Sequence, residues 1–353
     1  MTDAVPAIVL GGTGYVAGEL LRLVAGHPNL KLAAILSDSQ PGESVAKAFP
    51  HLQSAYPTLK FSSHEEIAVA IAREKASALF SAAPHGVSAG LVDGLLTRAQ
   101  QAGVRVHAVD ISADFRHASA VAYEKIYKQE HGAPERLKDF TCAVPEHLKT
   151  LRTPHVAHPG CFATAILLAS VPLLALGIAE PQLFVSGVTG STGSGRKPTE
   201  GTHHPLRHSD LYSYNALAHR HTPEIVACAQ AATGIAAEFA FVPHSGPFAR
   251  GMHVTVQARL KKECDSAVIR AGLAAYYENA PFVRVMAEAP RVKDVVATNY
   301  AHLSAATNAR SVAVMCAIDN LNKGAAGGGV QWMNRLLGFE EVAGLTAPAA
   351  GWT

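Results

Sequence analysis

The feature that most constrains the fold is a glycine-rich turn directly after the first apolar segment of the chain. Residues 7–10 read Ala-Ile-Val-Leu, a short strand pattern, and residues 11–18 read Gly-Gly-Thr-Gly-Tyr-Val-Ala-Gly. A helix is expected from about Glu19 to Ala25. Strand, glycine turn and helix in this order form a dinucleotide-binding fingerprint, here in a Gly-x-x-Gly-x-x-Ala variant. Gly11 would make the turn, and Gly14 would let the backbone approach a pyrophosphate bound at the helix N-terminus.

The end of the second expected strand bears on which dinucleotide is bound. Leu32–Leu36 is followed by Ser37, Asp38 and Ser39. An acidic residue here usually holds the ribose 2′-hydroxyl of NAD, whereas hydroxyl and basic groups accept the 2′-phosphate of NADP. The two serines favour the phosphate, and Asp38 opposes it unless its side chain points away. This segment alone therefore leaves the choice of cofactor open.

Strands and helices continue to alternate, which indicates an α/β chain with a parallel sheet in its N-terminal half. Strands are expected over residues 78–83 and 104–110, with a helix between them. Arg116 lies just past the second of these strands, where ligands bind in open α/β sheets. Its guanidinium could hold an anionic substrate group, and a structural ion pair is an equal alternative. The basic, proline-bearing segment 149–154 is interpreted as a domain boundary.

The sequence His-Pro-Gly-Cys-Phe at residues 158–162 precedes an apolar run, 163–170, that is typical of a buried helix. Pro159 and Gly160 suit a helix entrance, so Cys161 falls at or just inside the helix N-terminus. Unpaired N–H groups and the helix dipole there favour a thiolate, which is the nucleophilic form of cysteine. The alternative is an inert buried cysteine in an apolar run.

A polar glycine loop and an arginine add candidate anion-binding groups. The loop at residues 187–197 ends in Arg196 and Lys197 and could cradle a phosphate through backbone N–H groups, unless it is only a flexible linker. Arg250 precedes an alternating strand at 251–260 and could also reach the site.

Two histidines, His219 and His221, could supply an acid/base partner for the cysteine. Thr222 and Pro223 are expected to begin a helix, with Thr222 as the N-cap, so both histidines would lie on the segment before it. The residues 202–221 hold five histidines, but neither a His-x-x-x-His helix nor an accompanying cysteine pair is expected there to support a zinc site. We therefore expect no metal.

Bulk composition excludes several classes of protein. The chain has 353 residues, 48% hydrophobic and 16% charged, enough for two domains with cores. A net charge of +2 gives no argument for nucleic-acid or membrane partners. Five scattered cysteines favour a reducing compartment, and the N-terminus lacks the basic segment of a signal peptide, so a cytoplasmic location is expected. Cys316, inside an apolar strand pattern, is expected in the core.

With these motifs in this order, the chain resembles the N-acetyl-gamma-glutamyl-phosphate reductase family, of the aspartate-semialdehyde dehydrogenase type. The resemblance runs from about Ile8 to Leu337 and departs from the family where Ala143-Val144-Pro145-Glu146 replaces Gly-Leu-Pro-Glu and where the glycine loop is longer. The motifs that carry it are Gly11 to Tyr15, Pro84-His85-Gly86, Ser112 to Arg116, His158 to Cys161, Gly195-Arg196-Lys197, His219 to Ile225 and Asp319 to Ala326.

The resemblance implies an α/β fold in two domains. A Rossmann dinucleotide-binding domain, residues 1–155, would be rejoined by the C-terminal segment 324–353. An α+β domain, residues 156–323, would carry a mostly antiparallel sheet, the substrate site and the contact of a homo-oligomer.

The implied reaction is the NADPH-dependent reduction of N-acetyl-gamma-glutamyl phosphate to N-acetylglutamate 5-semialdehyde in arginine biosynthesis. Cys161 would form a thioester with release of phosphate, NADPH would reduce it, and a histidine, by resemblance His219, would move the proton. Three alternatives remain: the same chemistry on N-acetyl-aminoadipyl phosphate or another N-acyl glutamyl phosphate, a non-catalytic NADP-sensing protein, and a thiol hydrolase.

The site expected from motifs and resemblance together has three parts. The catalytic residues are Cys161 and His219, and the substrate-binding residues are Arg116, Arg196, Lys197, His221 and Arg250. The NADP(H)-binding residues are Gly11, Thr13, Gly14, Tyr15, Val16, Ser37, Ser39, Pro84, His85, Gly193, Ser194, Asn320 and Lys323.

Overall fold

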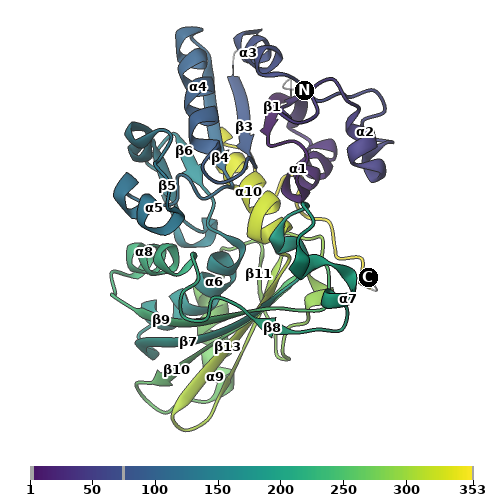
Figure 1. Ribbon diagram of the computed structural model, residues 1–353. Coiled ribbons are helices and arrows are strands. Elements are labelled where there is room, and N and C mark those ends of the chain that lie inside the picture. Colours follow the sequence, from purple (N-terminus) through teal and green to yellow (C-terminus); the bar gives the residue numbers. More distant parts are fainter. Residues whose placement is uncertain (1–3, 74–75, 352–353) are drawn as a thin grey trace. The chain divides into compact units, whose positions relative to one another are not determined.

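The computed structural model describes residues 4–73 and 76–351, which form two compact units (Figure 1). The N-terminal unit contains the residues up to Ala143, Thr150–His158 and Ala326–Thr346. The second unit contains Val144–Lys149, Pro159–Ala325 and the residues from Ala347 on. Within the described ranges, the helices are too short or too polar to cross a membrane.

The N-terminal unit is built on a parallel sheet with the strand order β2-β1-β3-β4-β6-β5. Its strands are β1 (Val5–Leu10), β2 (Leu30–Ile35), β3 (Ala76–Ser81), β4 (Arg105–Asp110), β5 (Phe140–Cys142) and β6 (His155–Ala157). Its helices are α1 (Tyr15–Ala25), α2 (Val45–Ala48), α3 (His64–Arg73), α4 (Ser88–Gln101), α5 (Ala120–Tyr127) and α10 (Gly327–Leu337). α1 packs against α10, and α3 packs against α4. This is the doubly wound arrangement that the strand–helix alternation predicts.

Helix α1 begins at Tyr15, four residues earlier than the sequence pattern indicates. The expectation of a start near Glu19 was wrong because Gly14 is itself the N-cap, so the helix follows the glycine turn directly. The first N–H groups of α1 therefore lie directly after the glycine turn, which is the geometry that binds a phosphate.

The second unit is built on a mixed sheet with the strand order β11-β12-β13-β10-β7-β9-β8. β7 pairs with β9 and β11 with β12 in parallel, and the other pairs are antiparallel. The strands are β7 (Ala179–Thr189), β8 (Tyr212–Ser213), β9 (Glu238–Ser245), β10 (Met252–Leu260), β11 (Val283–Val285), β12 (Ala301–Thr307) and β13 (Ser311–Ile318). The helices are α6 (Cys161–Ala175), α7 (His204–Arg207), α8 (Thr222–Thr233) and α9 (Ser266–Tyr276).

Helix α6 forms the core of the second unit and packs on β7, β10, β13, α8 and α9. Its apolar residues lie all round the helix, and 13 of its 15 residues are buried. Pro172 lies inside this helix, which nevertheless continues to Ala175. A proline leaves the carbonyl four residues earlier without its helical donor. Here the Tyr277 hydroxyl donates to that carbonyl, Leu168 O, at 2.7 Å, which removes the cost.

Candidate active site

Cys161 is the first residue of α6, and Gly160 is the N-cap. The first intrahelical hydrogen bond runs from the Thr164 N–H to the Gly160 carbonyl at 2.8 Å. Cys161 therefore lies at the positive end of a long, buried helix, as the motif predicts. The opposite side of the cysteine is closed by Gly324, where a Cβ atom would lie 2.6 Å from the Cβ of Cys161.

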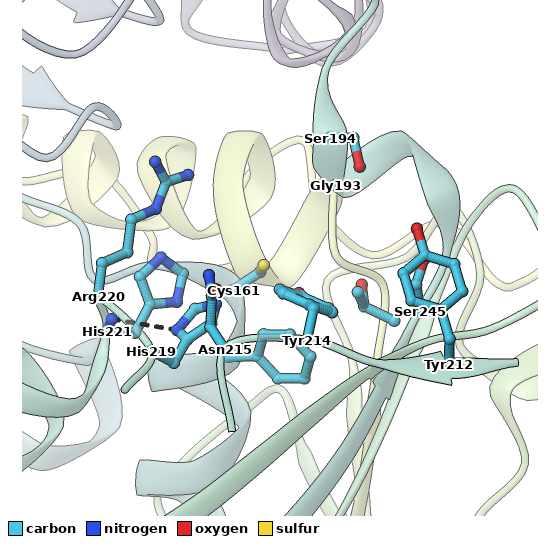
Figure 2. Close-up of a pocket in the computed structure, with 12 residues that line it drawn as sticks. Cys161, Gly193, Ser194, Tyr212, Tyr214, Asn215, His219, Arg220, His221 and Ser245 are labelled. Atoms are coloured by element: carbon cyan, nitrogen blue, oxygen red, sulfur yellow. Dashed lines mark hydrogen bonds between the residues drawn. The ribbon is translucent and has the colours of Figure 1, made fainter. Parts of the chain in front are cut away.

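A pocket of about 430 Å³ opens over this helix start (Figure 2). Cys161 shares it with His219 and with polar side chains from the β8 and β9 region and from the segment before α8. The lining consists of Cys161, Phe162, Thr189, Gly193, Ser194, Tyr212, Tyr214, Asn215, His219, Arg220, His221 and Ser245. A small molecule with several polar groups would fit such a pocket.

His219 is buried among aromatic rings, with Phe162, Tyr214 and Phe241 centred 5.3–5.8 Å from its ring. Its Nδ1 accepts a hydrogen bond from the backbone N–H of His221 at 3.1 Å, drawn as a dashed line in Figure 2. The neutral ring therefore carries its proton on Nε2. Burial, with a smaller contribution from the Arg220 charge, lowers the pKa of His219 to about 4. At neutral pH this histidine is an uncharged donor.

His221 packs directly on the N-cap of the cysteine helix. A Cβ on Gly160 would overlap its ring. His221 is also the N-cap residue of α8, and Thr222 is the first helical residue. The prediction that Thr222 caps this helix was wrong by one position, because His221 already has helical backbone angles, φ −81° and ψ −13°.

Glu224, in the first turn of α8, also contacts Gly160. Its Oε1 accepts the Gly160 N–H at 2.8 Å, and the side chain is fully buried. The start of α8 thus contacts the start of α6 at Gly160: Glu224 accepts its N–H, and the His221 ring packs against its Cα. The Gly160 N–H is engaged by this carboxylate, so an oxyanion would have to use groups further along the helix start.

Several lining residues were missed by the sequence argument. Tyr214 lies beside the cysteine, and its pKa is raised above the usual range by burial and, secondarily, by the charge of a Cys161 thiolate. Arg220 lines the pocket and is exposed. Its place between the two candidate histidines was a signal that could have found it. Tyr212 and Ser245 enter because β8 pairs with β9, a contact that sequence spacing does not reveal.

The basic residues proposed for substrate binding lie elsewhere. Arg196 and Lys197 are exposed, and neither belongs to the pocket lining among the residues that the structure describes. Arg250 donates from Nε to the buried Asp319 carboxylate at 2.6 Å. Arg116, in the N-terminal unit, donates from Nε to the His158 carbonyl at 2.9 Å, three residues before the cysteine in sequence.

Two residues proposed for the cofactor are engaged inside the second unit. Asn320 accepts the Gly251 N–H at 2.7 Å and donates to the Thr192 hydroxyl at 3.0 Å. Lys323 is fully buried and pairs with Glu146 at 2.5 Å. By contrast, Gly193 and Ser194 do line the pocket with Cys161. Cys316 is fully buried in β13, where burial raises the pKa of its thiol, so it belongs to the core.

The glycine turn of the N-terminal unit fits a dinucleotide. Gly11 has φ +80°, and a Cβ on it would lie 2.5 Å from the Ala82 carbonyl oxygen. At Gly14, by contrast, the nearest atom to a Cβ would be 3.9 Å away, which leaves space for a ligand. α1 has no side-chain cap and no acidic residue in its first turn, within the described ranges. Its backbone N–H groups, beginning with those at Tyr15 and Val16, can therefore face a pyrophosphate.

The other cofactor candidates lie at the ends of neighbouring strands. After β2, the Ser37 hydroxyl lies 3.4 Å from that of Ser39. After β3, the His85 Nδ1 accepts the Ala113 N–H at 3.0 Å, which fixes the turn that also contains Pro84. Thr13 lies in the turn between β1 and α1. Across the described ranges, His, Cys, Asp and Glu side chains form no cluster that could hold a metal ion.

Known protein families match both parts of the chain. Residues 6–148 match the family described as "Semialdehyde dehydrogenase, NAD binding domain", and residues 161–320 match "Semialdehyde dehydrogenase, dimerisation domain". The fold is similar to aspartate semialdehyde dehydrogenase II from Vibrio cholerae, with a TM-score of 0.68 and 15% identity over 95% of this chain and 99% of that one. A probable aspartate-semialdehyde dehydrogenase from Pseudomonas aeruginosa gives 0.66 and 16% over 95% and 99%. Fold and site define an oxidoreductase of the semialdehyde dehydrogenase class.

Sequence relatives narrow the class. The chain is 38% identical to the N-acetyl-gamma-glutamyl-phosphate reductase of Methanopyrus kandleri over 96% of this chain and 97% of that protein. The proteins of the same name from Desulforudis audaxviator and Ectopseudomonas mendocina are 35% and 37% identical, over 96% and 97% of this chain and 97% and 98% of their own lengths. The chain belongs to the N-acetyl-gamma-glutamyl-phosphate reductase family.

Proposed function

We propose that this chain reduces N-acetyl-gamma-glutamyl phosphate to N-acetylglutamate 5-semialdehyde, with release of phosphate, as a step of arginine biosynthesis. The observation that carries the proposal is Cys161 at the start of α6, in one pocket with a buried, neutral His219. The names of the relatives given above indicate the substrate. The dinucleotide is assigned to the N-terminal unit with α10, and the chemistry to the second unit.

The first half-reaction makes a thioester. The Cys161 sulfur attacks the acyl-phosphate carbonyl carbon, the carbon–oxygen bond to phosphate breaks, and phosphate leaves with the electron pair. The α6 dipole stabilises the thiolate before attack. Tyr214 and the Ser245 hydroxyl lie in the same pocket and can orient the acyl chain.

The second half-reaction makes the aldehyde. A dinucleotide held by the glycine turn before α1 would supply the hydride for the thioester carbonyl. The His219 Nε2–H donates to the carbonyl oxygen as negative charge develops there. The hemithioacetal anion held by this N–H then collapses to the aldehyde, the carbon–sulfur bond breaks, and Cys161 leaves as thiolate. A neutral histidine suits this role because its Nε2–H is a fixed donor, while its Nδ1 is engaged by the His221 N–H.

Substrate recognition falls to the groups that actually line the pocket. Arg220 is the arginine among them, and we assign it, with His221, to the anionic groups of the substrate. Arg116, Arg196, Lys197 and Arg250 stay predictions as substrate ligands. What supports Arg220 is that it lines the same pocket as Cys161, whereas these four residues are not among the described residues of that lining.

The cofactor is proposed to be NADP(H), because serines and not a lone acid follow β2. We also propose a homo-oligomer formed through the second unit, whose matching family is described as a dimerisation domain. A cytoplasmic location follows from the need of a thiol nucleophile for a reducing compartment.

The reverse reaction tests the proposal. The purified chain should reduce NADP⁺ with N-acetylglutamate 5-semialdehyde only when phosphate is present. Cys161→Ser should lose nearly all of this activity while NADPH binding stays unchanged, and Cys264→Ser, at a half-buried cysteine of the same unit, should behave as the wild type. Equal or better activity with the aminoadipate semialdehyde would favour the longer substrate. Cofactor binding without any turnover would favour a sensor.

A further inference from the structure

The segment before α3 lies in register with the end of β2. Leu36 and Ser62 form a parallel bridge, and the Ser62 N–H donates to the Ile35 carbonyl at 2.7 Å. The Ser37 N–H donates back to the Ser62 carbonyl at 3.4 Å. Asp38 and His64 each lie two residues beyond this bridge. The backbone therefore brings a histidine to the strand end that reads the ribose of a dinucleotide.

The two side chains meet at that strand end. His64 Nε2 lies 2.6 Å from Asp38 Oδ1, and the side chains are 55% and 58% exposed. A carboxylate only accepts hydrogen bonds, so Nε2–H is the donor whether or not the ring is charged. The Ser37 hydroxyl accepts the Gln40 N–H at 3.2 Å and lies 3.4 Å from the Ser39 hydroxyl. The hydroxyls of the buried Ser37 and the exposed Ser39, an imidazole and an engaged carboxylate thus lie together at this strand end.

This group of side chains bears on the choice between NAD(H) and NADP(H), which the sequence left open. A lone Asp38 would hold a 2′-hydroxyl and repel a 2′-phosphate. An exposed ion pair adds little to stability, so the pair has no strong structural reason to exist. Its effect on a ligand is larger, because the Nε2–H engages the carboxylate that a phosphate would otherwise meet, and a protonated ring adds a positive charge and an Nδ1–H donor.

We propose that His64 is the residue that selects NADP(H) over NAD(H), by engaging Asp38 and facing the 2′-phosphate. This inference rests on the proposed dinucleotide and goes beyond it by naming a residue that neither the fingerprint nor the family resemblance identifies. Ser37 and Ser39 complete the phosphate site, and Asp38 acts as the acceptor that holds the imidazole in place.

The test is a double-mutant cycle on cofactor binding, with no substrate present. Dissociation constants for NADPH and NADH are measured by calorimetry on the full chain for the wild type, His64→Ala, Asp38→Asn and the double variant. His51→Ala, at another exposed histidine of the same unit, is the matched control. Because all these side chains are exposed, thermal melting should show that each variant folds.

His64→Ala should weaken NADPH binding about five- to tenfold, the effect of one uncompensated like charge near the surface, and leave NADH within twofold. Asp38→Asn in the same chain should restore NADPH binding, because the carboxylate that repels the phosphate is gone. Raising the salt concentration should shrink the effect of His64→Ala.

Two results would overturn the inference and leave the proposed reaction intact. In one, His64→Ala binds NADPH as the wild type does. In the other, it weakens NADPH and NADH equally and Asp38→Asn gives no recovery. A wild type that prefers NADH would instead refute the cofactor proposal itself, with Asp38 as the ribose ligand.

Discussion

At the scale of single residues, two glycines that lack side chains, Gly160 and Gly324, allow close packing around the nucleophile Cys161. His221 occupies the space where a side chain on Gly160 would be, and Gly324 brings the backbone against Cys161. Gly160 has φ −61° and ψ 160°, which any residue adopts. Its glycine is therefore required by the close approach of the imidazole and not by backbone strain.

Gly160→Ala should displace His221 or the helix start and lower kcat at least about 100-fold, because misplacing a reacting group by about 1 Å costs that much. Gly94→Ala is the control, since a Cβ at Gly94 within α4 meets nothing within 4 Å. Steady-state kinetics of both variants, with melting curves, make the comparison. Normal kcat in Gly160→Ala would show that the contact with His221 has no catalytic meaning.

His219→Asn should lower kcat by roughly 10²–10⁴-fold, the usual range for a side chain that holds a proton at the reacting oxygen. The pKa of His219 is lowered to about 4 by burial, so the ring is neutral above that pH. The acid limb of the wild-type pH–rate profile should therefore lie well below 6.5, and the variant should lack it. A variant with unchanged kcat, or a limb that persists, would place the proton carrier elsewhere.

The sequence predicted the residues of the site better than their partners. Cys161, His219 and His221 line one pocket, and each lies in a short motif whose local structure is readable. Tyr212 and Ser245 were missed because only the β8–β9 pairing brings them in. A pattern of residues records spacing along one element, and it does not record which elements pair.

At the scale of elements, α6 continues past Pro172 because of a hydrogen bond from the residue that follows α9. The Tyr277 hydroxyl, just after α9, supplies the donor that Pro172 cannot, and the same hydroxyl accepts from His147 Nε2 at 2.8 Å. One phenol thus connects a proline-containing helix to the segment at Val144–Lys149. Burial raises the pKa of this phenol well above its ordinary value, so it stays a donor.

Tyr277→Phe should lower the free energy of unfolding by about 1–3 kcal/mol, because the Leu168 carbonyl and His147 are left buried without this partner. KM should stay unchanged, since Tyr277 is not among the pocket-lining residues that the structure describes. Tyr276→Phe, at the adjacent half-buried ring, is the control, and urea unfolding measures both. Equal stability of the two variants would contradict this account of Pro172.

Element prediction succeeded where residues have strong preferences and failed where pairing decides. The apolar strand expected around Cys316 is β13, Ser311–Ile318. β12, Ala301–Thr307, was missed because its alanines and serine have low strand propensity, and it exists through its pairing with β13. The glycine loop was expected from residue 187, but β7 extends to Thr189, because Gly187 packs on the Phe162 ring.

At the scale of the whole molecule, both units bury histidines in the neutral form. Burial is the main cause in each case and lowers the pKa to about 4 for His117, His147, His155 and His219. The unfolded chain takes up these protons near pH 6.5, so it binds more protons than the folded chain between pH 6.5 and 4. Stability from these groups is complete above pH 6.5 and is lost as the pH falls.

One group acts in the opposite direction. Burial raises the pKa of Asp110 to about 6, so its contribution is complete below pH 3.8 and is lost as the pH rises through 6. The four histidines outweigh it. The melting temperature should therefore be lower at pH 5 than at pH 7.5 by at least about 5 °C, and His155→Gln should reduce that difference more than His208→Gln, an exposed control. A melting temperature independent of pH would contradict the assignment of neutral buried histidines.

If Cys161 carries the acyl group, mass spectrometry should detect the acyl-enzyme. The chain is mixed with N-acetyl-gamma-glutamyl phosphate without NADPH, quenched in acid and digested. The account predicts one N-acetylglutamyl group per chain, on the peptide that contains Cys161, and its loss as the semialdehyde when NADPH is added before the quench. An adduct on Cys142, or turnover with NADPH but no thioester on Cys161, would contradict it.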